Sequence, residues 1–112
     1  MCRAAGDVSQ GDVLGLWRAE FEGLKQPATL LLDKHPEFAE TLRGAVHREG
    51  ERAEVAGDVF AGEFTLEESR NGTHISATWL GDVVDGSCGR EIRGLWKAEG
   101  DAMARPFVLR KL

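Results

Sequence analysis

The sequence predicts an all-β protein in which about eight antiparallel strands follow one another as an up-and-down meander and close into a barrel. Two observations predict this fold. Apolar and polar residues alternate with a period of two in segments of about eight to ten residues, which is the pattern of half-buried strands rather than of helices. Clusters that contain Gly, Asp, Asn or Pro separate these segments, as turns do in a meander.

Composition limits the organisation and the partners of the chain. Its 112 residues suffice for one hydrophobic core but not for two. The net charge of -5 and the scattered basic residues argue against a nucleic-acid partner. No apolar run approaches the roughly 20 residues of a membrane-spanning helix, so no transmembrane segment is expected. We expect a flexible N-terminal tail over 1–11 and a single barrel domain over 12–112.

The alternation and the turn residues together place the strands. Asn71-Gly72 is the strongest turn signal, because these two residues readily supply the positive φ values of a type I′ hairpin. Tight turns of the same kind are expected at Glu49-Gly50-Glu51, Ala61-Gly62 and Glu99-Gly100-Asp101. The expected strands lie near 12–22, 27–34, 39–49, 51–60, 62–70, 72–84, 89–99 and 104–111.

The alternation also assigns side chains to the interior. Trp17, Trp79 and Trp96 fall on inward faces, so all three indoles are expected inside the barrel. If the interior holds a cavity, we expect a small apolar ligand, because inward polar groups are scarce. The alternative is an interior filled by side chains. The expected ligand-binding residues are Trp17, Phe64, Trp79 and Trp96. Other residues assigned to the interior are Phe21, Val55, Val59, Phe60, Leu66, Ile75, Ile92, Phe107 and Leu109.

Apolar residues also occupy a few outward positions. They are Leu14 and Leu16 on the first strand, Leu95 on the seventh and Val108 on the eighth. If the barrel closes, these strands are neighbours, and the four residues are expected to form one apolar patch. Such a patch favours self-association, so we expect a homodimer or a larger homo-oligomer.

Four short motifs spread along most of the chain are Gly15–Trp17, Ile75–Trp79, Ile92–Trp96 and Pro106–Leu112. Together they resemble the motifs of the avidin-like and calycin barrels, a class that includes lipocalin-like folds. The resemblance implies a ligand-binding barrel in which Trp79 and Trp96 are wall residues of the pocket. The polar half of the avidin biotin site is not matched, because Ala19 and Val46 stand where the family has an asparagine and a tyrosine. Biotin binding is therefore not implied.

A second resemblance is to the small barrel inhibitors of bacterial metalloproteases. These proteins also open with a Gly-x-Trp motif and project an N-terminal segment into the protease cleft. The expected tail over 1–11 would be the corresponding segment here. The resemblance gives an alternative function, protease inhibition through this tail.

The sequence shows no pattern of catalytic or metal-binding residues. The histidines lie on different segments without metal-ligand spacing, and no serine lies in a nucleophile motif. Glu67 and Glu68 are neighbours that point to opposite faces of a strand. Glu68 is in phase with Phe64 and Leu66 near the barrel mouth, and we interpret it as a charge at a strand end. We therefore expect no enzyme, no cofactor and no metal, but a non-catalytic binding or interaction protein.

The two cysteines leave three interpretations open. Cys2 follows Met1 and precedes a polar stretch, so it is a candidate site for the lipid anchor of a bacterial lipoprotein. Cys2 and Cys88 are also candidates for a disulfide in an oxidising compartment, or for two free thiols in a cytoplasmic protein. We expect an exported protein, periplasmic or attached to the outer membrane, with a cytoplasmic protein as the alternative.

Overall fold

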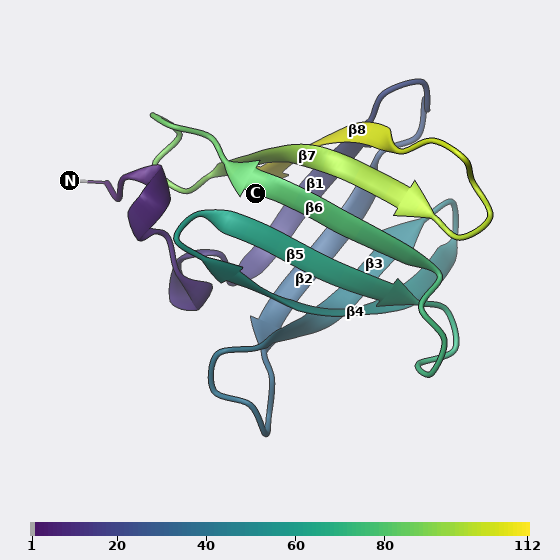
Figure 1. The fold of residues 1–112 in the computed structure, drawn as a ribbon, viewed down its shortest axis with the longest axis horizontal. Coiled ribbons are helices and arrows are strands. Elements are labelled where there is room, and N and C mark those ends of the chain that lie inside the picture. The colour runs from purple at the N-terminus through teal and green to yellow at the C-terminus, as the bar shows by residue number, and fades with distance from the viewer. Residues whose placement is uncertain (1) are drawn as a thin grey trace.

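The computed structural model describes residues 2–112 and confirms the predicted all-β fold (Figure 1). Its eight antiparallel strands follow in meander order, and β1 pairs with both β2 and β8, which closes the barrel. Two short 3-10 turns, η1 (Ala5–Asp7) and η2 (Gln10–Asp12), precede the strands. Within residues 2–112, no helix is long and apolar enough to span a membrane. The strands are β1 (Gly15–Phe21), β2 (Ala28–Lys34), β3 (Leu42–Arg48), β4 (Glu51–Phe60), β5 (Glu63–Ser69), β6 (Ala77–Val83), β7 (Glu91–Ala98) and β8 (Arg105–Lys111).

The two ends of the barrel differ. At the capped end, where the odd-numbered strands begin, residues 2–14 form a cap segment that lies across the barrel (Figure 1, purple). Val8 and Val13 of this segment belong to the hydrophobic core. Lys111 Nζ, at the end of β8, donates a hydrogen bond to the Asp12 carbonyl oxygen at 3.1 Å. The stretch expected as a flexible tail is thus anchored in the core at Val8, with Ala5 packed partly against it. The opposite end, where the odd-numbered strands finish, is called the mouth below.

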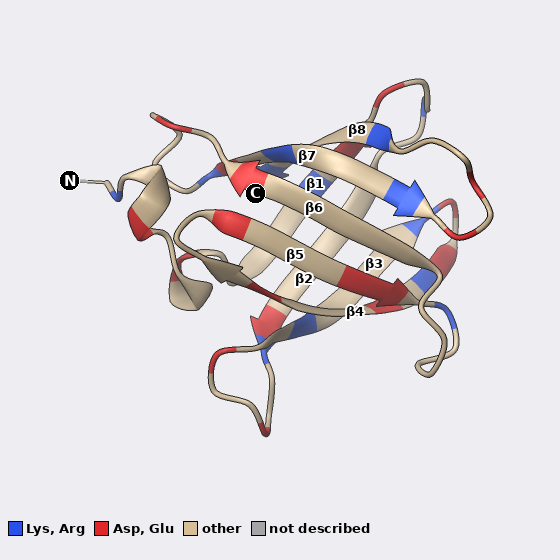
Figure 2. Ribbon diagram, viewed as in Figure 1, with Lys and Arg blue, Asp and Glu red and all other residues tan. Residues whose placement is uncertain are grey.

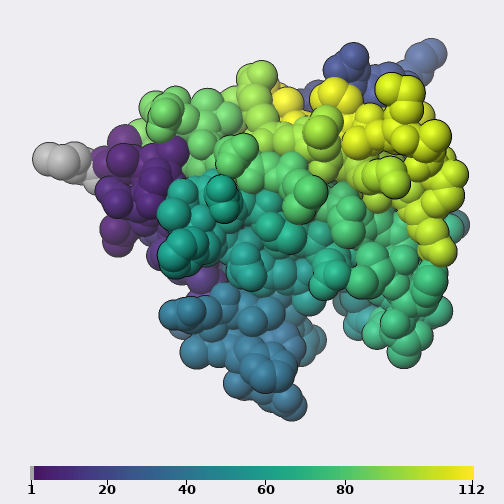
Figure 3. Space-filling model, in the orientation of Figure 1, coloured from purple at the N-terminus to yellow at the C-terminus, as the bar shows by residue number. Residues whose placement is uncertain are grey.

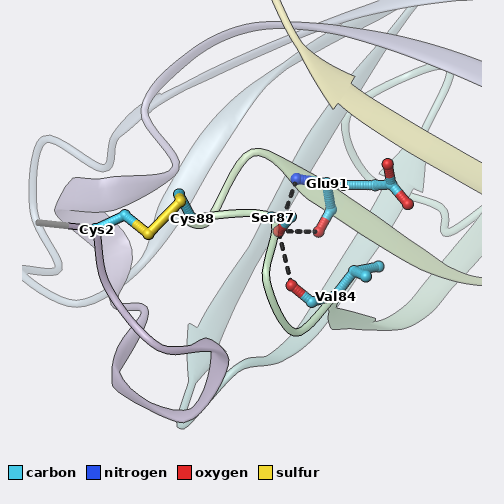
Figure 4. Close-up of a disulfide and its surroundings, with 5 residues drawn as sticks. All are labelled: Cys2, Val84, Ser87, Cys88 and Glu91. Atoms are coloured by element: carbon cyan, nitrogen blue, oxygen red, sulfur yellow. Dashed lines mark hydrogen bonds between the residues drawn. A yellow bond between two sulfur atoms is a disulfide. The ribbon is translucent and has the colours of Figure 1, made fainter.

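A disulfide joins the cap segment to the loop between β6 and β7 (Figure 4). Cys2 and Cys88 lie 86 positions apart in the sequence, and their Cα atoms are 4.8 Å apart. Ser87 holds the same loop in place, because its hydroxyl donates to the Val84 carbonyl oxygen at 2.7 Å and accepts from the Glu91 amide at 3.3 Å. Of the three interpretations of the cysteines, the disulfide is the one found in the structure.

The burial of side chains follows the predicted alternation along most strands. Trp17, Trp79 and Trp96 all point into the barrel and belong to its core, as predicted. Two predicted interior residues are exposed instead. Phe60 points outward because it directly follows the inward Val59 at the end of β4. Ile75 precedes the first residue of β6 and lies in a loop.

Tight turns form at two of the four predicted places. Glu99-Gly100-Asp101 does not form one, because only the glycine has a positive φ and β7 and β8 are joined by the longer loop 99–104. Glu49-Gly50 and Ala61-Gly62 have positive φ at both residues, as a type I′ turn requires. Asn71-Gly72 does not form such a turn, because β5 and β6 are joined by the longer loop 70–76. There Asn71 Oδ1 accepts a hydrogen bond from the His74 amide at 2.9 Å. The asparagine side chain organises this loop in place of the backbone conformation that was predicted.

Asp12 holds the cap segment in its folded form. Its carboxylate accepts hydrogen bonds from the Ser9 amide and from Arg3 Nε, each at 3.0 Å. The bond from the Ser9 backbone, and after it the Arg3 guanidinium, lower the pKa of the Asp12 carboxyl below its ordinary value of 3.8. The ionised form of Asp12 therefore stabilises the cap.

We expect Asp12→Ala to lower the free energy of unfolding by about 1 kcal/mol at neutral pH. Because the pKa of Asp12 is lowered in the folded state, its contribution is present above the unfolded value and is lost as the pH falls through the folded value. Urea unfolding of both proteins at neutral pH and near pH 2 measures this contribution, and the difference between them should shrink in acid. A difference that stays the same at both pH values would contradict this role.

Candidate functional site

One acidic side chain is buried inside the barrel near the mouth. Glu68, on β5, is 1% exposed, and it is the one polar or charged residue within 2–112 that is fully buried. The alternation along β5 carries it inward in phase with Phe64 and Leu66, as predicted. A charge inside a core destabilises a protein unless it is paired, so Glu68 must find partners there. Its burial corrects the interpretation of Glu68 as a simple charge at a strand end.

Three side chains from other strands satisfy the Glu68 carboxylate. Its Oε1 accepts hydrogen bonds from Trp79 Nε1 at 3.0 Å and from Trp96 Nε1 at 3.2 Å. Its Oε2 accepts a hydrogen bond from Arg48 Nη2 at 2.7 Å. Trp79 and Trp96 are direct neighbours across β6 and β7, which explains how one oxygen can serve both indoles. We call these four residues the Glu68 cluster.

Arg48 closes the mouth above this carboxylate. Its guanidinium carbon lies 4.9 Å from the centre of the Trp96 ring and 5.7 Å from that of Phe21, so the cation contacts two aromatic faces. The Arg48 side chain is 18% exposed, so part of it reaches solvent. Arg48 was not predicted as a site residue, although its position in phase with the inward Leu42 and Val46 of β3 was a usable signal.

A pocket of about 300 Å³ opens beside Arg48 at the mouth. Val46 and Ala53 form an apolar side of it, as direct neighbours across β3 and β4. The acidic end of β5 and basic parts of β7 and β8 all lie toward this end of the barrel (Figure 2). Among residues 2–112, no group of three or more His, Cys, Asp or Glu side chains is placed to hold a metal ion. The pocket is lined by Val46, Arg48, Glu51, Arg52, Ala53 and Arg70.

The four predicted ligand-binding residues fall into two groups. Trp79 and Trp96 belong to the Glu68 cluster at the mouth. Trp17 lies toward the capped end, where its Nε1 donates a hydrogen bond to the Val13 carbonyl oxygen at 2.8 Å. Phe64 lies near the start of β5, which is also at the capped end. None of the four residues lines the pocket at the mouth: Trp79 and Trp96 are linked to it only through Glu68 and Arg48, and the other two lie at the capped end.

The predicted apolar patch on the outer wall is divided by charged residues. Val108 lies between the strands that carry Leu16 and Leu95, but its neighbours across the sheet are Glu20 and Arg93. Leu16 lies near the capped end of β1, whereas Leu95 lies toward the mouth end of β7. These residues therefore form no continuous patch.

What remains on the outer wall is two separate apolar pairs. Leu16 faces Leu31 across β1 and β2, and Leu80 faces Leu95 across β6 and β7, all four being exposed. Leu14, which was also predicted to be part of the patch, packs partly against the core. Self-association stays a prediction, which light scattering on the wild type and on Leu95→Glu can test.

A second hollow lies on the outer wall, between the loop after β2 and the loop after β5 (Figure 3). Its volume is about 500 Å³, and the small side chains of Ala45 and Ala56 lie among its lining residues. Asp33, Arg43 and Glu67 place charges of both signs around it. This mixture indicates no single class of ligand.

Comparison with known proteins adds no relative from which a function could be transferred. Neither the models of known protein families nor the curated proteins contain a match to this sequence. The closed eight-stranded meander is compatible with a calycin-like fold. The geometry of the mouth is therefore the basis for a proposed function.

Proposed function

We propose that the protein is a non-catalytic binding protein that takes a small molecule at the mouth of its barrel. The observation that supports this is the pocket beside the Glu68 cluster, where a polar group inside the barrel meets an accessible hollow. Small-molecule sites combine apolar walls with a few placed polar groups. Val46 and Ala53 offer the wall here, and Arg48 offers the polar group.

The packing of the aromatic rings indicates that a ligand binds at the mouth and not in the space between the indoles. The ring centre of Phe21 lies 5.4 Å from that of Trp79 and 5.2 Å from that of Trp96. Trp79 also packs edge-on against Phe107, with 5.1 Å between ring centres. A ligand among these rings would have to displace side chains that are already in contact, whereas the pocket needs no such displacement.

The three indole N–H groups can report where a ligand binds. Those of Trp79 and Trp96 bond to Glu68 beside the pocket, and that of Trp17 bonds to Val13 at the capped end. We expect a mixed set of neutral, anionic and cationic small aromatic molecules to include one that shifts the Trp96 indole signal in a nitrogen-correlated NMR spectrum. The Trp17 signal should stay in place and serves as the internal control.

Each other outcome of this experiment has a distinct meaning. A set in which no molecule moves the Trp96 signal would contradict the proposed function. A molecule that moves all three indole signals equally would place the ligand between the rings, as the sequence first suggested. A molecule that moves only the Trp17 signal would place the site under the cap segment.

We also propose that the protein is exported. The disulfide between Cys2 and Cys88 supports this, because structural disulfides persist mainly in oxidising compartments. A lipid anchor would use the same Cys2 sulfur, so the anchor and the disulfide exclude each other in one molecule. The alternative function, inhibition of a protease by the N-terminal segment, would require the part around the buried Val8 to leave the core.

A further inference from the structure

We infer that the ligand of the mouth pocket is a small organic monoanion, a carboxylate on a short apolar group. This inference rests on the proposed function and names the class of its ligand. It is carried by the guanidinium groups around the pocket, by the partners that these groups lack and by the apolar pair beside them.

The arginine side chains that line the pocket have few hydrogen-bond partners. An arginine side chain has five N–H donors. Arg48 makes one side-chain hydrogen bond, to Glu68, and its Nη1 is buried without a hydrogen-bond partner in the structure of residues 2–112. Arg52 and Arg70 line the same pocket and form no salt bridge within residues 2–112. A carboxylate brings the acceptors that this set of donors lacks, and it matches the fork of a guanidinium.

The balance of charge at the pocket selects a single negative charge. Arg48, Arg52 and Arg70 carry three positive charges, and Glu51 on the rim and Glu68 beneath Arg48 carry two negative ones. The difference is one positive charge, although the whole chain has a net charge of -5. A monoanion would neutralise this local excess, whereas a cation would meet three guanidinium groups.

The apolar side of the pocket indicates that the ligand carries a small apolar group beside its carboxylate. Val46 and Ala53 offer a small hydrophobic surface beside the arginines. The volume of about 300 Å³ lies at the lower end of the range for small-molecule sites, which favours a ligand the size of a single ring. Benzoate has this size, this charge and an apolar body, and it serves as the probe below.

The test compares three probes of one shape but different charge. Benzoate, benzamide and benzamidinium are titrated separately into the wild-type protein, with the Trp96 indole signal as the readout. We expect benzoate to bind at least about tenfold more tightly than benzamide, and benzamidinium to bind most weakly. If benzamide or benzamidinium binds at the mouth as tightly as benzoate, the anion inference is overturned while the proposed function stands.

Variants of two exposed arginines test whether the charges that contribute to benzoate binding lie at the pocket. Arg70→Gln is expected to weaken benzoate binding by about five- to tenfold. Arg18→Gln is the matched control, because Arg18 is an exposed residue on the outer wall of β1, outside the pocket. It makes the same change in net charge and should leave benzoate affinity unchanged. An equal loss in both variants would overturn the inference, since the effect would then come from the charge of the whole protein. Absence of benzoate binding to the wild type would also overturn it, and the mixed set of molecules then decides the proposed function separately.

Discussion

Replacing Glu68 by alanine is expected to lower the free energy of unfolding by about 3 to 5 kcal/mol. The change leaves the Arg48 guanidinium without its acidic partner in a largely buried position. It also removes the acceptor for the indole N–H groups of Trp79 and Trp96 inside the core. Buried donors without partners destabilise a protein even where no other contact changes.

Urea unfolding measures this loss, with Glu67→Ala as the matched control. Glu67 is the neighbouring glutamate on β5, but it points outward and is exposed. Its replacement should change the stability by no more than about 0.5 kcal/mol. If Glu68→Ala unfolds the protein completely, Glu68→Gln gives the measurable case, because its amide oxygen can still accept from the indoles. Equal stabilities of the two alanine variants would show that the Glu68 cluster contributes nothing to the fold.

Loss of the disulfide is expected to lower the free energy of unfolding by about 2 to 4 kcal/mol. The bond between Cys2 and Cys88 closes a loop across a separation of 86 residues, which restricts the unfolded chain strongly. It also holds the cap segment over the barrel, where Val8 and Val13 complete the core. The double variant Cys2→Ser, Cys88→Ser should therefore unfold at a lower urea concentration.

A reducing agent provides the control for this experiment. Reductant should lower the urea midpoint of the wild type toward that of the double serine variant and leave the variant itself unchanged. If reductant moves neither midpoint, the disulfide contributes nothing to stability. If it moves both midpoints, its effect is not on this bond.

Local alternation in the sequence was enough to predict most of the fold. It predicts the strand order, the inward tryptophans and the turns at Glu49-Gly50 and Ala61-Gly62, because each depends on neighbours along the chain. The turn at Asn71-Gly72 failed for a local reason as well. The asparagine side chain bonds to the backbone of its own loop, and this competes with the hairpin that the dipeptide would otherwise favour.

The site was less predictable, because its parts come from four strands. The inward phase of Glu68 was visible in the sequence, but its burial depends on an arginine 20 positions earlier and on an indole 28 positions later. No local pattern in the sequence predicts that Arg48 and Trp96 donate hydrogen bonds to the same carboxylate. The divided outer patch has the same cause, since the register of β8 decides which residues lie between Leu16 and Leu95.

The cap segment and the last strand place both ends of the described chain away from the mouth. Cys2 is bonded to Cys88 at the capped end, and the Leu112 amide donates to the Leu16 carbonyl oxygen at 2.9 Å near the start of β1 (Figure 1). An attachment through either end, to a surface or to another folded unit, would therefore orient the barrel with its mouth directed outward. The protein can be immobilised or fused at either terminus while the pocket still faces the surrounding solution.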